Sequence, residues 1–165
     1  MRRSDHSMRP PSPAVSVEYG SPSACETCHS EQGARWAREQ VVRWHGPDGQ
    51  ASALATASLV AAARGRDWTR LSDMAAYLAD PGRNVVVAAS LVRLLEDCDD
   101  PAAAGMLRVS LSDPSPLVRA SAVRAIGARG SIGDLDGLLA ATSDETRLVR
   151  VRAARALAGI PDPAV

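Results

Sequence analysis

The chain of 165 residues contains no lysine and no phenylalanine, and has only three tryptophans and two tyrosines. All 19 basic residues are therefore arginines, and 19 acidic residues balance them to a formal net charge of zero. A domain that binds nucleic acid normally carries a basic excess, so this balance argues against a nucleic-acid partner. Because alanine, leucine and valine supply most of the apolar content, we expect a helical core built from small side chains.

Long apolar runs are also missing, and none approaches the roughly 18 residues that a membrane-spanning helix needs. The opening residues, Met1-Arg2-Arg3-Ser4-Asp5-His6, lead into no apolar segment of the kind found in a secretory signal peptide. We therefore expect no membrane span. A standalone product of this sequence is expected in the cytoplasm, whereas a periplasmic or other extracytoplasmic location would make it a fragment of a longer exported protein.

Cysteine is scarce, with three residues, but two of them lie in Cys25-Glu26-Thr27-Cys28-His29. Cys-x-x-Cys-His is the pattern of c-type haem attachment, in which the thiols add to the haem vinyl groups and the imidazole binds the iron. The pattern predicts haem c as cofactor, with Cys25 and Cys28 attached covalently and His29 as the proximal ligand. The alternatives are a chance cysteine pair beside a surface histidine, or a zinc site completed by His6 or His45.

Composition changes along the chain define three parts. Residues 1–24 are rich in proline and serine and have no apolar periodicity, which predicts an irregular arm. Residues 25–48 form the haem-attachment segment, where Trp36 and Trp44 recur with glutamines at fourfold spacing and predict a helix over 31–44. The two tryptophans either cover a porphyrin face or pack in a core. Residues 49–165 form the third part.

The third part contains an internal repeat. Three similar blocks, Val87–Leu95, Val118–Ile126 and Val149–Leu157, place Arg93, Arg124 and Arg155 at intervals of 31 residues. Asp80-Pro81, Asp113-Pro114 and Asp144 precede the blocks, and we expect these aspartates to cap helices. The intervening segments Leu71–Ala79, Ala102–Leu111 and Leu135–Ala141 are each long enough for another helix, so the repeating unit is predicted to be a helical hairpin.

Hairpins of this length bury their apolar faces by stacking, which predicts an all-α fold, an α-solenoid. The blocks and their period resemble short HEAT-type repeats over about residues 51–160, with valine and alanine facing inward. We expect the repeated arginines to pair with acidic residues of neighbouring repeats, and a basic stripe on a binding surface is the alternative.

The whole chain also resembles the last part of exported multihaem c-type cytochromes that end in HEAT or tetratricopeptide repeats. The resemblance rests on Asp5-His6-Ser7-Met8, the prolines, Cys25–His29, Trp36 and Trp44-His45-Gly46-Pro47, in the same order. It implies that His29 is a proximal haem ligand and that His6 is a distal ligand, to this haem or another. The chain departs from the family by having a single Cys-x-x-Cys-His, which suggests a fragment, and by His45 where an aromatic residue is expected.

The axial ligands decide what such a haem would do. Two imidazoles, from His29 and His6, would make a low-spin electron carrier, whereas Met8 or an open sixth position would raise the potential or allow ligand binding. His45 is a substitute ligand or a surface residue beside a turn. Cys98, between Asp97 and Asp99, has no second cysteine nearby and is expected to be inert.

Two functions follow from the sequence. The first is electron transfer by a covalently bound haem on a helical-repeat platform, with a redox protein or other haem domains as partners. The second is an interaction module whose repeats bind a protein while the haem motif stays unused. No constellation typical of a hydrolase or kinase is present, so we expect an electron carrier rather than an enzyme, although a parent multihaem protein could be an oxidoreductase.

Overall fold

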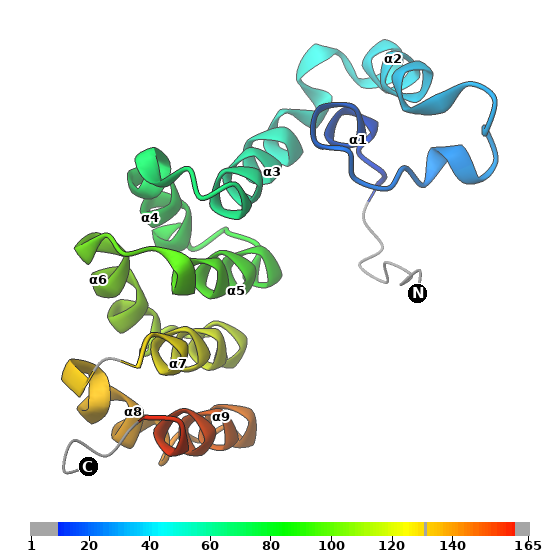
Figure 1. Cartoon of the computed structure of the whole chain (residues 1–165). Helices are drawn as coiled ribbons and strands as arrows, with labels where there is room; N and C mark the ends of the chain where they lie inside the picture. The colour runs from blue at the N-terminus through cyan, green and yellow to red at the C-terminus, as the bar shows by residue number, and fades with distance from the viewer. Residues whose placement is uncertain (1–9, 131, 161–165) are drawn as a thin grey trace. The chain divides into compact units, whose positions relative to one another are not determined.

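The computed structural model describes residues 10–130 and 132–160, and these residues contain helices and turns but no β-strand. The predicted all-α solenoid is confirmed (Figure 1). None of the described helices combines the length and the apolar character needed to cross a bilayer. The chain divides into two compact units, Met1–Ser58 and Leu59–Val165.

The first unit is organised by two helices, α1 (Pro13–Tyr19) and α2 (Gly33–His45), which pack against each other. A short 3-10 turn, Cys25–Thr27, lies between them, and another, Pro47–Gln50, leads into α3 (Ala51–Arg64). The small side chains Ala14 and Ala37 are buried. Helix α2 agrees closely with the helix expected over residues 31–44.

Helix α1 lies within residues 1–24, where the sequence predicts an irregular arm. Pro13 occupies its first turn, where the missing N–H has no helical partner in any case, and Gly20 ends it at φ 64°. The buried Oε1 of Gln50 accepts hydrogen bonds from the Ser12 hydroxyl at 3.1 Å and the Ala14 N–H at 3.0 Å. These contacts join residues 36 and 38 positions apart, so no local pattern reveals them.

The second unit consists of helical hairpins. Their helices are α4 (Leu71–Ala79) with α5 (Val85–Leu94), α6 (Pro101–Ser110) with α7 (Pro116–Arg129), and α8 (Leu135–Ala141) with α9 (Arg147–Ala158). Short 3-10 turns cover Trp68–Arg70, Leu95–Asp97 and Ile132–Asp134. The second helices α5, α7 and α9 lie side by side in one layer (Figure 1), as expected for stacked repeats.

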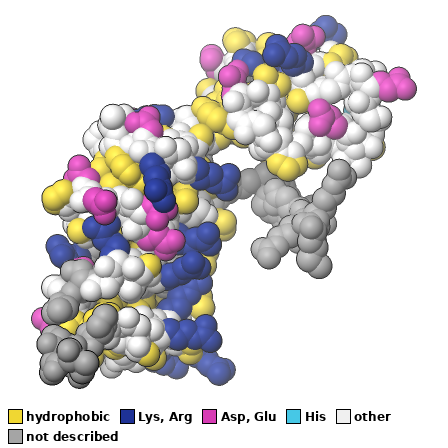
Figure 2. Space-filling view, viewed as in Figure 1, with side chains coloured by type: hydrophobic (Ala, Val, Ile, Leu, Met, Phe, Trp, Pro, Cys, Tyr) yellow, Lys and Arg dark blue, Asp and Glu magenta, His cyan; other side chains and the backbone are white. Residues whose placement is uncertain are grey.

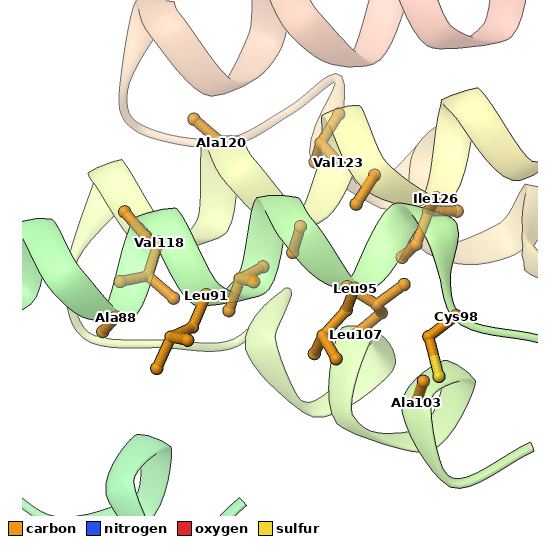
Figure 3. Packing of buried hydrophobic residues seen from close by; sticks show 14 of the residues in the cluster. Ala88, Leu91, Leu95, Cys98, Ala103, Leu107, Val118, Ala120, Val123 and Ile126 are labelled. Atoms are coloured by element: carbon orange, nitrogen blue, oxygen red, sulfur yellow. The ribbon is translucent and has the colours of Figure 1, made fainter. Parts of the chain in front are cut away.

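The core of this unit lies between the layers. Leu91 and Leu95 share one cluster with Leu107 from α6 and Ile126 from α7 (Figure 3), and all four side chains are at most 1% exposed. Cys98 belongs to the same core and is fully buried. Alanines such as Ala88 and Ala120 line the faces between neighbouring second helices, which lets the helices approach closely.

The helix starts differ in detail from the prediction. Asn84, Ser115 and Thr146, rather than the repeated aspartates, occupy the N-cap positions of the second helices. The side chains of Asp113 and Asp144 instead accept hydrogen bonds from the N–H groups of Ser115 and Thr146, at 2.8 and 2.7 Å. The aspartates therefore shape the turn before each helix, because their short side chains reach the backbone two residues ahead.

Candidate functional site

The Cys25–His29 segment forms a single compact turn. The N–H groups of Cys28 and His29 both donate to the carbonyl oxygen of Cys25, at 3.3 and 2.9 Å. Cys25 is half-buried, Cys28 is exposed, and neither is in a disulfide. The turn thus holds two free thiols and an exposed imidazole within five residues of backbone.

A carboxylate fixes this turn to the start of α2. Glu26 Oε1 accepts a hydrogen bond from the Ala34 N–H at 2.9 Å, and so satisfies one of the donors left open at a helix start. Gly33 reaches the helix at φ 73°, a left-handed conformation that favours glycine. The cysteine turn and α2 therefore form one local structure.

The imidazole of His29 is oriented by α2. Its Nδ1 lies 3.2 Å from Gln32 Oε1, and its ring centroid lies 4.7 Å from that of Trp36, with the planes at 45°. An amide oxygen is an acceptor, so this contact favours the tautomer in which Nδ1 carries the proton. In that tautomer the Nε2 lone pair is available to a metal, which is the usual arrangement of a metal-binding histidine.

The other expected ligands are placed differently. His6 and Met8 lie outside the described residues. His45 is the last residue of α2, about 18 Å of helix away from Gly33 at the 1.5 Å rise of an α-helix, so the structure does not bring His45 to His29. Trp44 is 69% exposed, and of the two tryptophans in α2 it is Trp36 whose ring contacts His29. Within the described residues no three histidine, cysteine or acidic side chains converge as a metal-ligand group.

A second candidate site lies on the second helices of the repeats. Equivalent positions, 31 residues apart, form two rows on the same helical face: an apolar row of Val86, Leu117 and Leu148, and an arginine row of Arg93, Arg124 and Arg155. Within one helix the two rows are seven residues, or about 10 Å, apart. Val86 is 63% and Leu148 is 42% exposed, so the apolar row is open on the first and last hairpins.

The charge of these helices is of one sign. Helix α5 carries one arginine, α7 three and α9 four, and none of the three contains an acidic residue. Figure 2 shows arginine side chains gathered along the side of this unit where α7 and α9 lie. The neutral chain therefore has a local basic surface that its overall composition conceals.

The expected pairing of arginines with acidic residues of the neighbouring repeat does occur, but largely through other arginines. Arg119 donates from Nε and Nη2 to the two carboxylate oxygens of Asp144, at 2.8 and 3.0 Å, and Arg83 pairs with Asp113. The hydrogen bond from Arg119 lowers the pKa of Asp144 below its ordinary value, outweighing the effect of burial. These pairs join neighbouring repeats and lie beneath the surface, with side chains 10–12% exposed.

Within residues 10–130 and 132–160 the arginine row itself has almost no acidic partners. Arg124 Nε is 3.9 Å from Glu96, a distance at the limit of an ion pair, and the described residues offer Arg93 and Arg155 no carboxylate. Arg152 of α9 lies next to the row and donates to the Ala120 carbonyl at 2.9 Å. Burial, and then repulsion from Arg124 and Arg93, lowers the pKa of Arg152, so cations from three helices face one region.

The sequence period identified the arginine row but not its neighbours. Val86, Leu117 and Leu148 follow the same 31-residue spacing, yet valine and leucine at a repeated position suggest core until their exposure is known. The positions equivalent to Arg152 in the two preceding repeats are serines, Ser90 and Ser121, so the sequence repeat did not point to an arginine there.

A family model for HEAT repeats matches residues 71–158, which span α4 to α9. No curated protein matches the chain.

Proposed function

Since the chain belongs to the HEAT-repeat family, we propose that its repeats bind a partner protein through the exposed face of α5, α7 and α9. The observation that carries this proposal is the face shared by the three helices, in which an apolar row and an arginine row recur at the repeat period. Apolar side chains and arginines left exposed together are typical of protein interfaces.

The buried interactions of the unit support this assignment because, apart from Leu117, which packs against the core, they do not use the side chains of the two rows. The core is closed by Leu91, Leu95, Leu107 and Ile126, and the repeats are joined by the Arg119–Asp144 pair. Val86, Arg93 and Arg155 contribute to neither, so their side chains are free to contact another molecule.

The test is position-specific photocrosslinking in the cells from which the protein comes. A photoreactive amino acid at Ser90, which is exposed on α5 between Val86 and Arg93, should give an adduct with another protein. The matched control is Ser72, exposed on the first helix α4, which should give none. The adduct should also disappear when Val86 and Leu148 are both changed to serine. Equal adducts from both positions, or none from either, would overturn the proposal.

A second function is proposed for the first unit: attachment of a c-type haem at Cys25 and Cys28, with His29 as the proximal ligand. One observation favours it, namely that the His29 ring contacts Gln32 Oε1 through Nδ1, at 3.2 Å, rather than through Nε2, beside two free thiols on the same turn. When bound, haem would supply reversible one-electron chemistry. Trp36 would restrict rotation of the His29 ring, and Glu26 would hold the turn in place. This function requires an extracytoplasmic location.

Haem attachment is tested by expressing the chain as an exported fusion together with a haem-attachment system. The expected result is a haem absorbance that survives denaturation and that is lost in Cys25→Ala/Cys28→Ala. Cys98→Ala is the control and should retain it, because Cys98 is buried in the other unit's core. His29→Ala should keep the covalent mass but change the spectrum. A protein of unmodified mass would refute this function, and an unchanged spectrum in His6→Ala would remove His6 as a ligand.

A further inference from the structure

We propose that the arginine row binds an extended acidic segment of a partner protein, with one carboxylate at every third residue and a polyproline II conformation. The proposal rests on the protein-binding function above and names the chemistry of the partner. It starts from the three cations of the row, Arg93, Arg124 and Arg155, which are all exposed and which come from three successive second helices.

The first argument is charge. Helices α5, α7 and α9 have no acidic residue, and Glu96, at 3.9 Å from Arg124, is the one carboxylate that the described residues bring to the row. Arg152 adds a further cation at its edge. Exposed arginines that repel one another gain from a ligand that inserts negative charge between them, and their planar guanidinium groups suit carboxylates particularly well.

The second argument is spacing. Packed helices lie about 8–10 Å apart, so equivalent arginines on successive second helices repeat at about that interval. A polyproline II segment has three residues per turn and rises about 3.1 Å per residue, so every third side chain falls on one face at intervals of about 9.3 Å. A β-strand cannot match this arrangement, because its residues i and i+3 point to opposite faces. The spacing of the row therefore matches a polyproline II segment with one carboxylate at every third residue.

The third argument is the apolar row. It lies about two helical turns from the arginine row on the same face, so a segment that crosses the helices at the arginines has Val86 and Leu148 along its side. Proline or alanine residues between the carboxylates would contact these apolar side chains. The face therefore fits an acidic segment interspersed with small apolar residues better than a uniformly acidic one.

The proposal is tested with two fluorescein-labelled peptides of identical composition and the whole chain. One peptide has four repeats of Pro-Pro-Glu, and the other has eight prolines followed by four glutamates. Fluorescence anisotropy at low salt should show binding of the repeating peptide that is at least about tenfold tighter than binding of the block peptide, since only the first matches the row.

Arg93→Gln/Arg124→Gln/Arg155→Gln should weaken binding of the repeating peptide by at least about tenfold. The matched control, Arg35→Gln/Arg43→Gln/Arg66→Gln, removes three exposed arginines from elsewhere and should change binding by less than about twofold. A peptide with lysine in place of glutamate should not bind the unmodified chain, a result that needs no variant to fold.

The outcomes separate this proposal from the one on which it rests. Equal binding of the two glutamate peptides, equal weakening by both triple variants, or stronger competition by duplex DNA than by the repeating peptide would overturn the arginine-row proposal. If Ser90 crosslinks a partner while neither peptide binds, the repeats bind protein by other means and only the present inference fails. If Ser90 gives no adduct and the peptides do not bind, both fail.

Discussion

Replacing Arg119 with methionine should loosen the last helical hairpin, α8–α9, from the hairpin before it. Arg119 joins the two: Nη1 donates to the carbonyls of Asp113 and Pro114 at 3.0 and 3.2 Å, while Nε and Nη2 hold the Asp144 carboxylate of the next repeat. Methionine has similar length but no donor. In the variant Asp144 stays charged and poorly solvated, and its carboxylate loses the two hydrogen bonds that Arg119 Nε and Nη2 donate.

The expected loss is about 3 kcal/mol in the free energy of unfolding. Breaking a buried ion pair costs about 3–5 kcal/mol, and hydrogen bonds to charged groups contribute about 1.5–3 kcal/mol each. The Arg119 and Asp144 side chains are 10% and 12% exposed, so water can solvate part of the charge that Asp144 retains in the variant. The expected loss therefore lies at the lower end of the range for a buried ion pair. The midpoint of thermal unfolding should fall by on the order of 10 °C.

Arg150→Met is the matched control. Arg150 lies 31 residues after Arg119 and makes the same kind of backbone contacts, to the carbonyls of Asp144 and Glu145 at 2.8 and 2.9 Å, but pairs with no carboxylate in the described chain. Its loss should be about 1 kcal/mol. Urea denaturation followed by far-ultraviolet circular dichroism gives both values. Their difference measures the ion pairs of Arg119 with Asp144 and Glu145, less the weaker attraction between Arg150 and Asp144.

The dependence on pH gives an independent check. The folded-state pKa of Asp144 is lowered by Arg119, so the stability from this pair is fully present above the unfolded pKa of about 3.9. It is lost as the pH falls through the lower folded-state pKa. The difference between the unmodified chain and Arg119→Met should therefore shrink between pH 7 and pH 3. Equal losses in the two variants, or a difference that persists undiminished at pH 3, would refute this reasoning.

Three further outcomes are expected. In Gly127→Ala the new Cβ would lie 2.5 Å from Ala156 Cβ and 3.1 Å from Ala156 Cα, so α7 and α9 must separate at a cost of about 1–3 kcal/mol. Adding Ala156→Gly to this variant should restore part of the lost stability. Unchanged urea unfolding of Gly127→Ala would contradict the close packing. Leu107→Ala should lower the free energy of unfolding by about 2–5 kcal/mol because the side chain is fully buried, whereas Val109→Ala, at 77% exposure, should lower it by less than about 0.5 kcal/mol. Similar losses at both positions would show that the core is assigned to the wrong residues. Glu26→Ala should speed hydrogen exchange of the Ala34 amide several-fold, because it removes the acceptor of the Ala34 N–H. Glu26→Gln should speed the exchange less, since glutamine keeps an acceptor. Equal exchange rates in the unmodified chain and the two variants would mean that Glu26 does not cap α2.

Much of the second unit was predictable because its information is local and repeated. The predicted helices Leu71–Ala79 and Leu135–Ala141 match α4 and α8 in their bounds, and the three repeated blocks lie on α5, α7 and α9. Stacking followed because a single hairpin cannot bury its apolar face. The first unit was predicted less well, since α1 depends on a contact with Gln50 that lies far along the chain.

The candidate sites divide in the same way. The Cys-x-x-Cys-His motif and the arginine period are spacings along one chain segment, so the sequence alone identified Cys25, Cys28, His29, Arg93, Arg124 and Arg155. Three-dimensional packing decided which arginines meet carboxylates, because Arg119 and Asp144 are 25 residues apart and meet only when the repeats stack. It also decided that Nδ1 of His29 faces Gln32 and that His45 lies at the far end of α2.

The sequence by itself thus determined a helical solenoid, its period and the place of the Cys-x-x-Cys-His motif, since amphipathic periodicity and short motifs act within one or two helical turns. Tertiary structure alone decided that Arg83 and Arg119 pair with carboxylates of the next repeat, whereas Arg93, Arg124 and Arg155 of the arginine row stay exposed. Exposure depends on how closely neighbouring helices pack, and that distance is set by side chains from separate repeats acting together.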